Sequence, residues 1–257
     1  MDVDEFTGVM SCASLEASLA RTHCDAVIVV RPYGIWTDIS DIADMCQRRG
    51  IHLIVDNAAG LGVDLDIVNR FRIRNSIEVF SLHATKPFGV GEGGIIAAPT
   101  QIQGRIRTAL NFGIDPISHS NSFRGINGKM SELTAAVALA ALEGISNRVL
   151  IRQTMASGYI ARAEAAGYEL YCTDFGRSPW QCFPIRISIK IEMDRLISAC
   201  AARGLQVRRY YRPVLAQYCE NSTKLSDTTL CLPIYDDENA NRIDEIWSAF
   251  SEAINCQ

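Results

Sequence analysis

The residues most suited to chemistry lie between two apolar runs, residues 77–80 and 95–98. This stretch contains the hydroxyl of Ser81, the primary amine of Lys86 and a glycine-rich segment at residues 89–94. An amine beside a hydroxyl and exposed backbone N–H groups suits a small anionic ligand that reacts with the amine. The alternative is a plain strand–turn–strand connection in which Lys86 is only solvated. The stretch by itself does not decide between the two.

The region before this stretch predicts a strand–helix–strand unit. Residues 26–31 and 52–56 are short β-branched runs, and the first is apolar on both faces, which is typical of a strand buried on both sides. Between them, Thr37 or Asp38 is a candidate cap for an amphipathic helix that ends at Gly50. A right-handed crossover of this kind predicts two parallel neighbouring strands.

A carboxylate, Asp56, closes the second of these strands. Residues 77–81 and 94–98 supply a third and a fourth strand. Since ligands of open α/β sheets bind where strands end, we expect Asp56 to share an edge and a pocket with Ser81 and Lys86.

The rest of the chain predicts a smaller α+β unit. We expect a large domain over residues 1–147 and a small domain over residues 148–257. The other elements that the sequence predicts are helices over residues 14–21, 130–143, 148–166, 193–202 and 239–254, and strands over residues 182–187 and 206–211.

Composition excludes several classes of function. The chain has 257 residues, 48% of them hydrophobic and 21% charged, which describes an ordinary globular protein. A net charge of −4 without a basic block argues against nucleic acid or an anionic membrane as a partner. The nine cysteines form no C-x-x-C pair, and no apolar run reaches membrane-spanning length. We therefore expect a cytoplasmic protein with reduced thiols.

Competing motifs fail on their context. The glycines at residues 89–94 lead into a strand, whereas a dinucleotide-binding fingerprint opens a helix. Ser81 and His83 leave a serine hydrolase conceivable, but no G-x-S-x-G elbow supports it. The histidines are dispersed without the spacing of metal ligands, so we expect no metal site: His23, His52, His83 and His119.

Several blocks of the sequence together resemble the DegT/DnrJ/EryC1/StrS family of sugar aminotransferases. Residues 80–86 with 91–94 are similar to the family's lysine motif, residues 55–62 to its aspartate block, and residues 125–132 to its G-x-N-x-[RK]-M-[ST]-[ED] segment. Residues 210–213 and 231–234 are also similar to the family pattern. The blocks occur in family order and cover nearly the whole chain.

The resemblance implies a fold-type I transferase: an α/β protein with a mainly parallel sheet flanked by helices, plus a smaller α+β C-terminal domain. It implies pyridoxal 5'-phosphate as cofactor, bound covalently by Lys86, with Asp56 holding the proton on its ring nitrogen. Ser81 matches the family's phosphate-binding serine. Asn127 matches an asparagine that reaches the phosphate from the partner subunit.

The function implied is amino transfer from an amino acid, with glutamate as the expected donor, to a keto group of a nucleotide-linked sugar in polysaccharide biosynthesis. The dehydratase relatives have His where this chain has Lys86, which argues for amino transfer. The implied assembly is a homodimer with the active site at its interface. The alternative is a non-catalytic family member that serves as a binding or oligomerisation module.

Two departures from the family pattern bear on these expectations. Ala59 stands where many members have Gln or His near the cofactor ring. Residues 1–4 resemble an internal family position, so about a hundred N-terminal residues of a typical member lie outside this chain, an amount comparable to much of a domain. In the family that segment carries a phosphate-binding helix N-terminus and an aromatic ring that stacks on the cofactor. We therefore expect this N-terminally truncated chain alone to bind the cofactor weakly.

Overall fold

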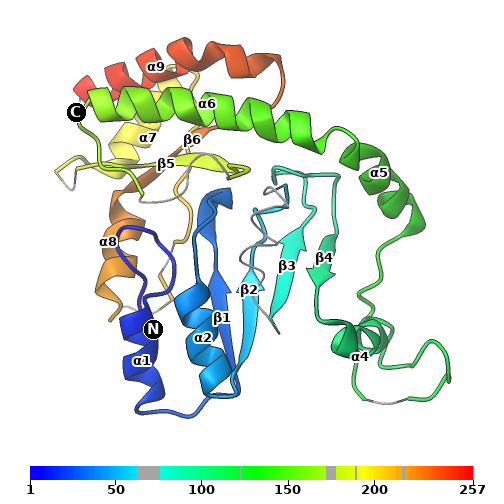
Figure 1. Ribbon diagram of the computed structural model, residues 1–257. Coiled ribbons are helices and arrows are strands. Elements are labelled where there is room, and N and C mark those ends of the chain that lie inside the picture. Colours follow the sequence, from blue (N-terminus) through cyan, green and yellow to red (C-terminus); the bar gives the residue numbers. More distant parts are fainter. Residues whose placement is uncertain are drawn as a thin grey trace.

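The computed structural model describes residues 1–62, 76–121, 123–171, 178–188, 190–212, 214–215 and 218–256. Within them the chain forms two β-sheets with helices packed against them, as Figure 1 shows. This is the α/β arrangement that the sequence predicts.

The larger sheet is built from the apolar runs of the N-terminal half. Its strands are β1 (Ala26–Val30), β2 (His52–Asp56), β3 (Ile77–Ser81) and β4 (Gly94–Ala97), hydrogen-bonded in that order. β1, β2 and β3 are parallel, and β4 runs antiparallel to β3. The crossover from β1 to β2 passes through α2 (Ser40–Arg48). The four predicted strands and the mainly parallel sheet are therefore confirmed.

Helices cover one face of this sheet. α1 (Cys12–Leu19) and α2 form a core with the side of β1 that carries Val27 and Val29, both fully buried. On the opposite side, Ile28 is 59% exposed and Val30 is 42% exposed. The prediction that residues 26–31 are buried on both faces is therefore wrong, because the described residues leave one side of β1 open.

The smaller sheet is enclosed. β5 (Cys182–Arg186) pairs antiparallel with β6 (Thr229–Pro233). α6 (Ile145–Ala165), α7 (Met193–Ala202) and α9 (Ile243–Asn255) pack with it around one apolar core, and α6 lies across the end of the larger sheet (Figure 1). Tyr33 and Ile35, which follow β1, also belong to this core. The core thus joins the two sheets.

Other elements agree with the sequence in part. α5 (Glu132–Leu142), α6, α7 and α9 match predicted helices, whereas α4 (Thr100–Leu110) and α8 (Glu220–Thr228) were not predicted. Two short 3-10 helices, η1 (Pro32–Gly34) and η3 (Glu238–Arg242), complete the described elements.

The predicted strand over residues 206–211 is wrong. Within it only Arg208 pairs, through backbone hydrogen bonds of 3.1 and 2.8 Å with Cys231. Tyr211 has a φ of 64°, a left-handed conformation that a strand does not accommodate.

Among the described residues, no single helix is long and apolar enough to cross a membrane. α5 and α6 meet the length and composition only as a pair that is bent by 64°. The division of the chain after residue 147 falls within the first turn of α6 and stays a prediction.

Candidate functional site

The ends of β2 and β3 bring two predicted site residues to one edge of the larger sheet. Asp56 is the register partner of Val79 in β3, and both strands are parallel. The pairing continues past the strand ends, because Ser81 N donates to the carbonyl of Ala58 at 3.2 Å. The structure therefore places Asp56 and Ser81 on adjacent chain segments at the same sheet edge, as the sequence predicts.

Lys86 lies in the tight turn that connects β3 to β4. Ala84 N donates to the carbonyl of Gly91 at 2.8 Å, and Gly91 and Gly93 have φ angles of 122° and 146°. A Cβ atom on Gly89 would lie 2.6 Å from the carbonyl oxygen of Ala84. The turn itself thus requires these glycines. Their presence is not a separate argument for a phosphate site.

The amine of Lys86 has a specific partner. Its Nζ donates to Oε1 of Gln181 at 3.3 Å, and both side chains are partly buried. Gln181 directly precedes β5, so this bond links the lysine turn to the smaller sheet. The alternative in which Lys86 is only solvated does not describe this structure.

Asp56 is partly buried and accepts a hydrogen bond at Oδ1 from the backbone N–H of Ala58, at 3.1 Å. Tyr211 lies nearby, with its ring centroid 5.2 Å from that of Tyr33. Although 52% of Tyr211 is exposed, burial of its hydroxyl raises the pKa of the phenol, and the Asp56 carboxylate acts in the same direction.

A partly buried ion pair links the ends of the three parallel strands beside Asp56. Arg31, 7% exposed, reaches Oε1 of Glu78 at 3.2 Å, and the same oxygen accepts from Nδ2 of Asn57 at 2.8 Å. Arg31 also donates from its backbone N to the carbonyl of Asp56 at 2.9 Å. Burial lowers the pKa of Arg31, and Glu78 opposes that shift. The network fixes the strand end that carries Asp56.

The two predicted phosphate ligands are placed differently. Ser81 is partly buried, and its Oγ accepts from the backbone N–H of His83 at 3.1 Å, which leaves its hydroxyl hydrogen able to donate. Asn127 is exposed on the segment between α4 and α5, where it pairs with Asn111. Within the described part of the chain, no hydrogen bond joins Asn127 to Lys86, Asp56 or Ser81. Its predicted role in a partner's site stays a prediction.

A pocket of about 170 Å³ lies beside the lysine turn. Thr85, next to Lys86, and Gln181 form part of its wall, and the rest comes from β5, β6 and the segment before α8. The remaining lining residues are Cys182, Gln206, Arg208, Tyr210, Cys231, Leu232, Pro233 and Ile234.

The side chains of this site are of the chemical types that pyridoxal phosphate requires. The cofactor requires an amine for its aldehyde, an anionic acceptor for its ring nitrogen and donors for its phosphate. Lys86, Asp56 and Ser81 supply one of each. Among the described residues, the hydrogen bond to the Asp56 carboxylate is the one at Oδ1 from Ala58 N. No group of three or more His, Cys, Asp or Glu side chains in the described ranges could hold a metal ion.

Sequence reasoning did not identify Gln181, Tyr211 or the pair Arg31–Glu78 as parts of this site. Gln181 is 95 residues from Lys86, and Glu78 is 47 residues from Arg31. Separations of this size in the sequence do not indicate that the two residues of either pair are in contact. For Tyr211 a signal existed, because residues 210–213 resemble a family block.

The sequence model of the DegT/DnrJ/EryC1/StrS aminotransferase family matches residues 1–251. A curated relative, the dTDP-4-amino-4,6-dideoxy-D-glucose transaminase of Shigella dysenteriae, is 26% identical over an alignment that covers 98% of this chain and 72% of the relative. The family that the sequence motifs indicate is therefore confirmed.

Two solved structures show the same fold. A DegT/DnrJ/EryC1/StrS aminotransferase from Brucella abortus has a TM-score of 0.85 at 22% identity, covering 98% of this chain and 72% of its own. NtdA from Bacillus subtilis, solved with its cofactor PMP bound, has a TM-score of 0.84 at 21% identity, covering 99% and 62%. The predicted fold class is thus confirmed. This chain spans 62% to 72% of the length of these three proteins.

Proposed function

Because the chain belongs to the DegT/DnrJ/EryC1/StrS aminotransferase family, we propose that it transfers an amino group from glutamate to a keto group of a nucleotide-linked sugar. The observation that supports the proposal is that Asp56 and Ser81 lie on adjacent segments at one sheet edge, with Lys86 in the connection that follows Ser81. The name of the Shigella relative, a dTDP-sugar transaminase, supports the sugar substrate. The choice of glutamate follows the resemblance to the family.

Pyridoxal phosphate, when bound, supplies an aldehyde that bonds to amines and a ring that accepts electrons. We assign Lys86 to hold it through Nζ and, once free, to take a proton from the α-carbon of the amino donor. Nζ donates to the neutral amide of Gln181, which is an acceptor and not a competing base. Lys86 is therefore held in place and still able to accept a proton.

We assign Asp56 to the ring nitrogen of the cofactor and Ser81 to its phosphate. The carboxylate of Asp56 would accept from the ring N–H of the bound cofactor and so keep a proton on the ring nitrogen. The Ser81 hydroxyl donates to the phosphate. Asn127, exposed between α4 and α5, donates to the phosphate of a partner's site, which makes the active form a homodimer.

We place this enzyme in the cytoplasm. Its eight described cysteines are free thiols, a state that a reducing compartment maintains.

A second candidate function is a non-catalytic binding or oligomerisation module. The exposed apolar side of β1, with Ile28 and Val30, favours it, because contiguous exposed apolar surface often marks an interaction site. The two candidates differ in whether the chain turns over an amino donor.

The test is a half-reaction. The purified chain is incubated with excess pyridoxal phosphate and glutamate, and 2-oxoglutarate is measured, with Lys86→Ala as the control. The aminotransferase proposal predicts 2-oxoglutarate from the wild-type chain at a rate well above that of Lys86→Ala. Equal rates for the two proteins would favour the binding module. A nucleotide-linked keto sugar added afterwards then tests the acceptor.

A further inference from the structure

The side chain of Gln181 is the described hydrogen-bond partner of the Lys86 amine. Oε1 of Gln181 accepts from Nζ at 3.3 Å, across 95 residues of sequence. An amide oxygen accepts from a charged amine and, more weakly, from a neutral one, and it does not take the proton itself. Gln181 can therefore hold the amine in one direction through a cycle in which the amine gains and loses protons.

The backbone of Gln181 is fixed from the side of the larger sheet. Its N–H donates to the carbonyl of Tyr33 at 2.8 Å, and Trp180 N donates to the carbonyl of Gly34 at 3.1 Å. A Cβ on Gly34 would lie 2.7 Å from the nitrogen of Gln181, so glycine permits this close approach. The segment that carries Gln181 is thus pinned to the chain that follows β1.

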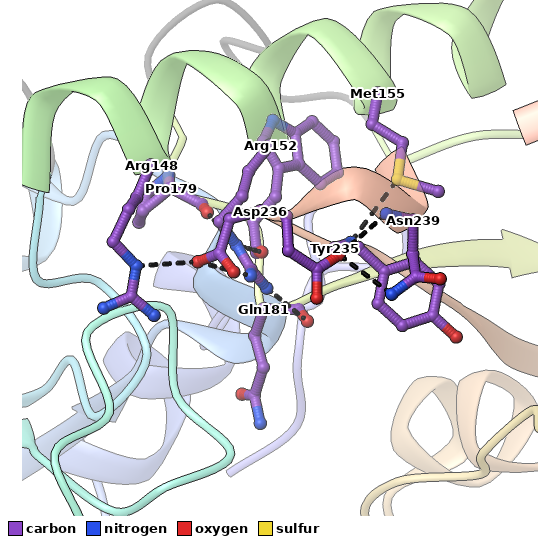
Figure 2. Close-up of polar contacts among 10 residues, drawn as sticks. Arg148, Arg152, Met155, Pro179, Gln181, Tyr235, Asp236 and Asn239 are labelled. Atoms are coloured by element: carbon purple, nitrogen blue, oxygen red, sulfur yellow. Dashed lines mark hydrogen bonds and ion pairs between the residues drawn. The ribbon is translucent and has the colours of Figure 1, made fainter. Parts of the chain in front are cut away.

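A buried arginine fixes the same segment from the other side. Arg152 of α6 is 6% exposed, and its guanidinium donates to the carbonyls of Pro179 (3.1 Å), Trp180 (2.8 Å) and Gln181 (3.1 Å). Figure 2 shows these contacts, with the side chain of Gln181 extending away from the arginine. Three successive carbonyls on one rigid group leave Gln181 little freedom to shift.

The charge of Arg152 is balanced by Asp236, which follows β6. Its Oδ2 lies 3.3 Å from Arg152 Nη1 and 2.9 Å from Arg148 Nε (Figure 2). Burial lowers the pKa of Arg152, and Asp236 opposes that shift. Arg148 shares the carboxylate but makes none of the described bonds to the backbone of residues 179–181. Arg152 and Arg148, both on α6, therefore form a matched pair of test and control positions.

We infer that Gln181 is a positioning residue for Lys86, held in place by Arg152. The inference rests on the proposed role of Lys86 in binding pyridoxal phosphate. A side chain that aims the amine at the aldehyde accelerates bond formation by orientation, because small misplacements of a reacting atom slow a reaction strongly. Gln181 need not touch the cofactor to have this effect.

The test compares Gln181→Met, which keeps the length but removes the acceptor, with Gln101→Met, which changes an exposed glutamine of α4 outside the pocket lining. Each protein is mixed with saturating pyridoxal phosphate and quenched with borohydride at intervals. Mass spectrometry then measures attachment at Lys86. We expect attachment to be on the order of tenfold slower in Gln181→Met and unchanged in Gln101→Met. Equal rates in Gln181→Met and wild type would overturn the inference.

A double-mutant cycle separates positioning from a merely structural role. Binding of pyridoxal phosphate is measured by equilibrium dialysis in wild type, Gln181→Met, Lys86→Ala and the double variant. If Gln181 acts through Lys86, Gln181→Met weakens binding in the wild type and has no further effect in Lys86→Ala. The same loss in both backgrounds would show a structural role and overturn the inference.

The role of Arg152 in holding Gln181 is tested by comparing Arg152→Lys with Arg148→Lys. We expect slower attachment only in Arg152→Lys, because of these two arginines it is Arg152 whose described bonds include the carbonyl of Gln181. Equal slowing in both variants would overturn the role of Arg152. A wild-type chain that attaches no cofactor at Lys86 would overturn the proposed function and this inference with it. Normal wild-type attachment with no effect of Gln181→Met would overturn the inference alone.

Discussion

The two sheets of this molecule differ in how they are covered and in what they carry. β1 and β5 are both mainly apolar runs of five residues, yet β1 alternates exposed and buried positions, whereas every residue of β5 is buried. The residues with the predicted chemistry lie at the end of the half-covered sheet. The enclosed sheet contributes the rigid support, Gln181 with its anchor Arg152. The residues with the predicted chemistry and the residues that hold Lys86 in position thus come from different parts of the chain.

The largest effect that we expect is a loss of transfer rate, without a matching loss of stability, when Asp56 at the end of the half-covered sheet is replaced. Asp56→Asn keeps the shape of the side chain but removes the charge that holds the ring proton. We expect the transfer rate to fall about 100-fold or more, in the range of acid–base contributions. Cofactor affinity and the midpoint of urea unfolding should change far less. Equal losses of rate and affinity would make Asp56 a structural residue.

A matched pair of isoleucines tests the difference in coverage directly. Ile185 in β5 is 0% exposed and Ile28 in β1 is 59% exposed. Ile185→Ala should lower the free energy of unfolding by about 2–5 kcal/mol, because it leaves a cavity. Ile28→Ala should cost less than about 1 kcal/mol, because its side chain already meets water. Urea unfolding measures both, and similar losses would show that another surface covers β1 in solution.

A smaller effect concerns Asp2, which joins the N-terminus to α8 of the C-terminal region. Its carboxylate accepts from the backbone N–H groups of Asn221 (2.8 Å) and Ser222 (2.9 Å) and from the Ser222 hydroxyl (2.7 Å), at the start of the helix. Asp2→Ala should cost about 1 kcal/mol at pH 7, the usual value of a helix cap.

This contribution should depend on pH. Burial pushes the pKa of Asp2 up, but the hydrogen bonds from Ser222, Asn221 and Val3 outweigh it, so the pKa in the folded chain is lowered. A lowered pKa gives stability that is present above the unfolded pKa, about 3.9, and is lost as the pH falls through the folded pKa. The difference between wild type and Asp2→Ala in urea unfolding should therefore shrink from pH 7 to pH 3. A constant difference would contradict the role of the charge.

The sequence predicted the local parts of the site well. Asp56 and Ser81 each stand at the end of a clear apolar run, and Lys86 follows Ser81 in the next connection. Parallel strands bring their carboxyl ends to the same edge of a sheet, so such ends are neighbours. The structure confirms that Asp56 and Ser81 are adjacent. The chemical roles of these residues, and that of Asn127, stay predictions.

The parts that sequence reasoning missed depend on contacts between distant segments. Gln181 reaches Lys86, and Asp2 caps α8, only because folding brings these segments together. The open side of β1 could not be predicted from Ile28 and Val30, since apolar composition does not say what packs against a strand. The strand expected over residues 206–211 fails because Tyr211 takes a left-handed backbone beside Tyr33.

The measurement that tests the central claim most directly is the site of covalent cofactor attachment. The wild-type chain is saturated with pyridoxal phosphate, reduced with borohydride, digested, and its peptides are mapped by mass spectrometry. We expect one modified lysine in the wild-type chain, Lys86, and no stoichiometric modification in Lys86→Ala. Stoichiometric attachment at another lysine, or attachment that survives in Lys86→Ala, would contradict it.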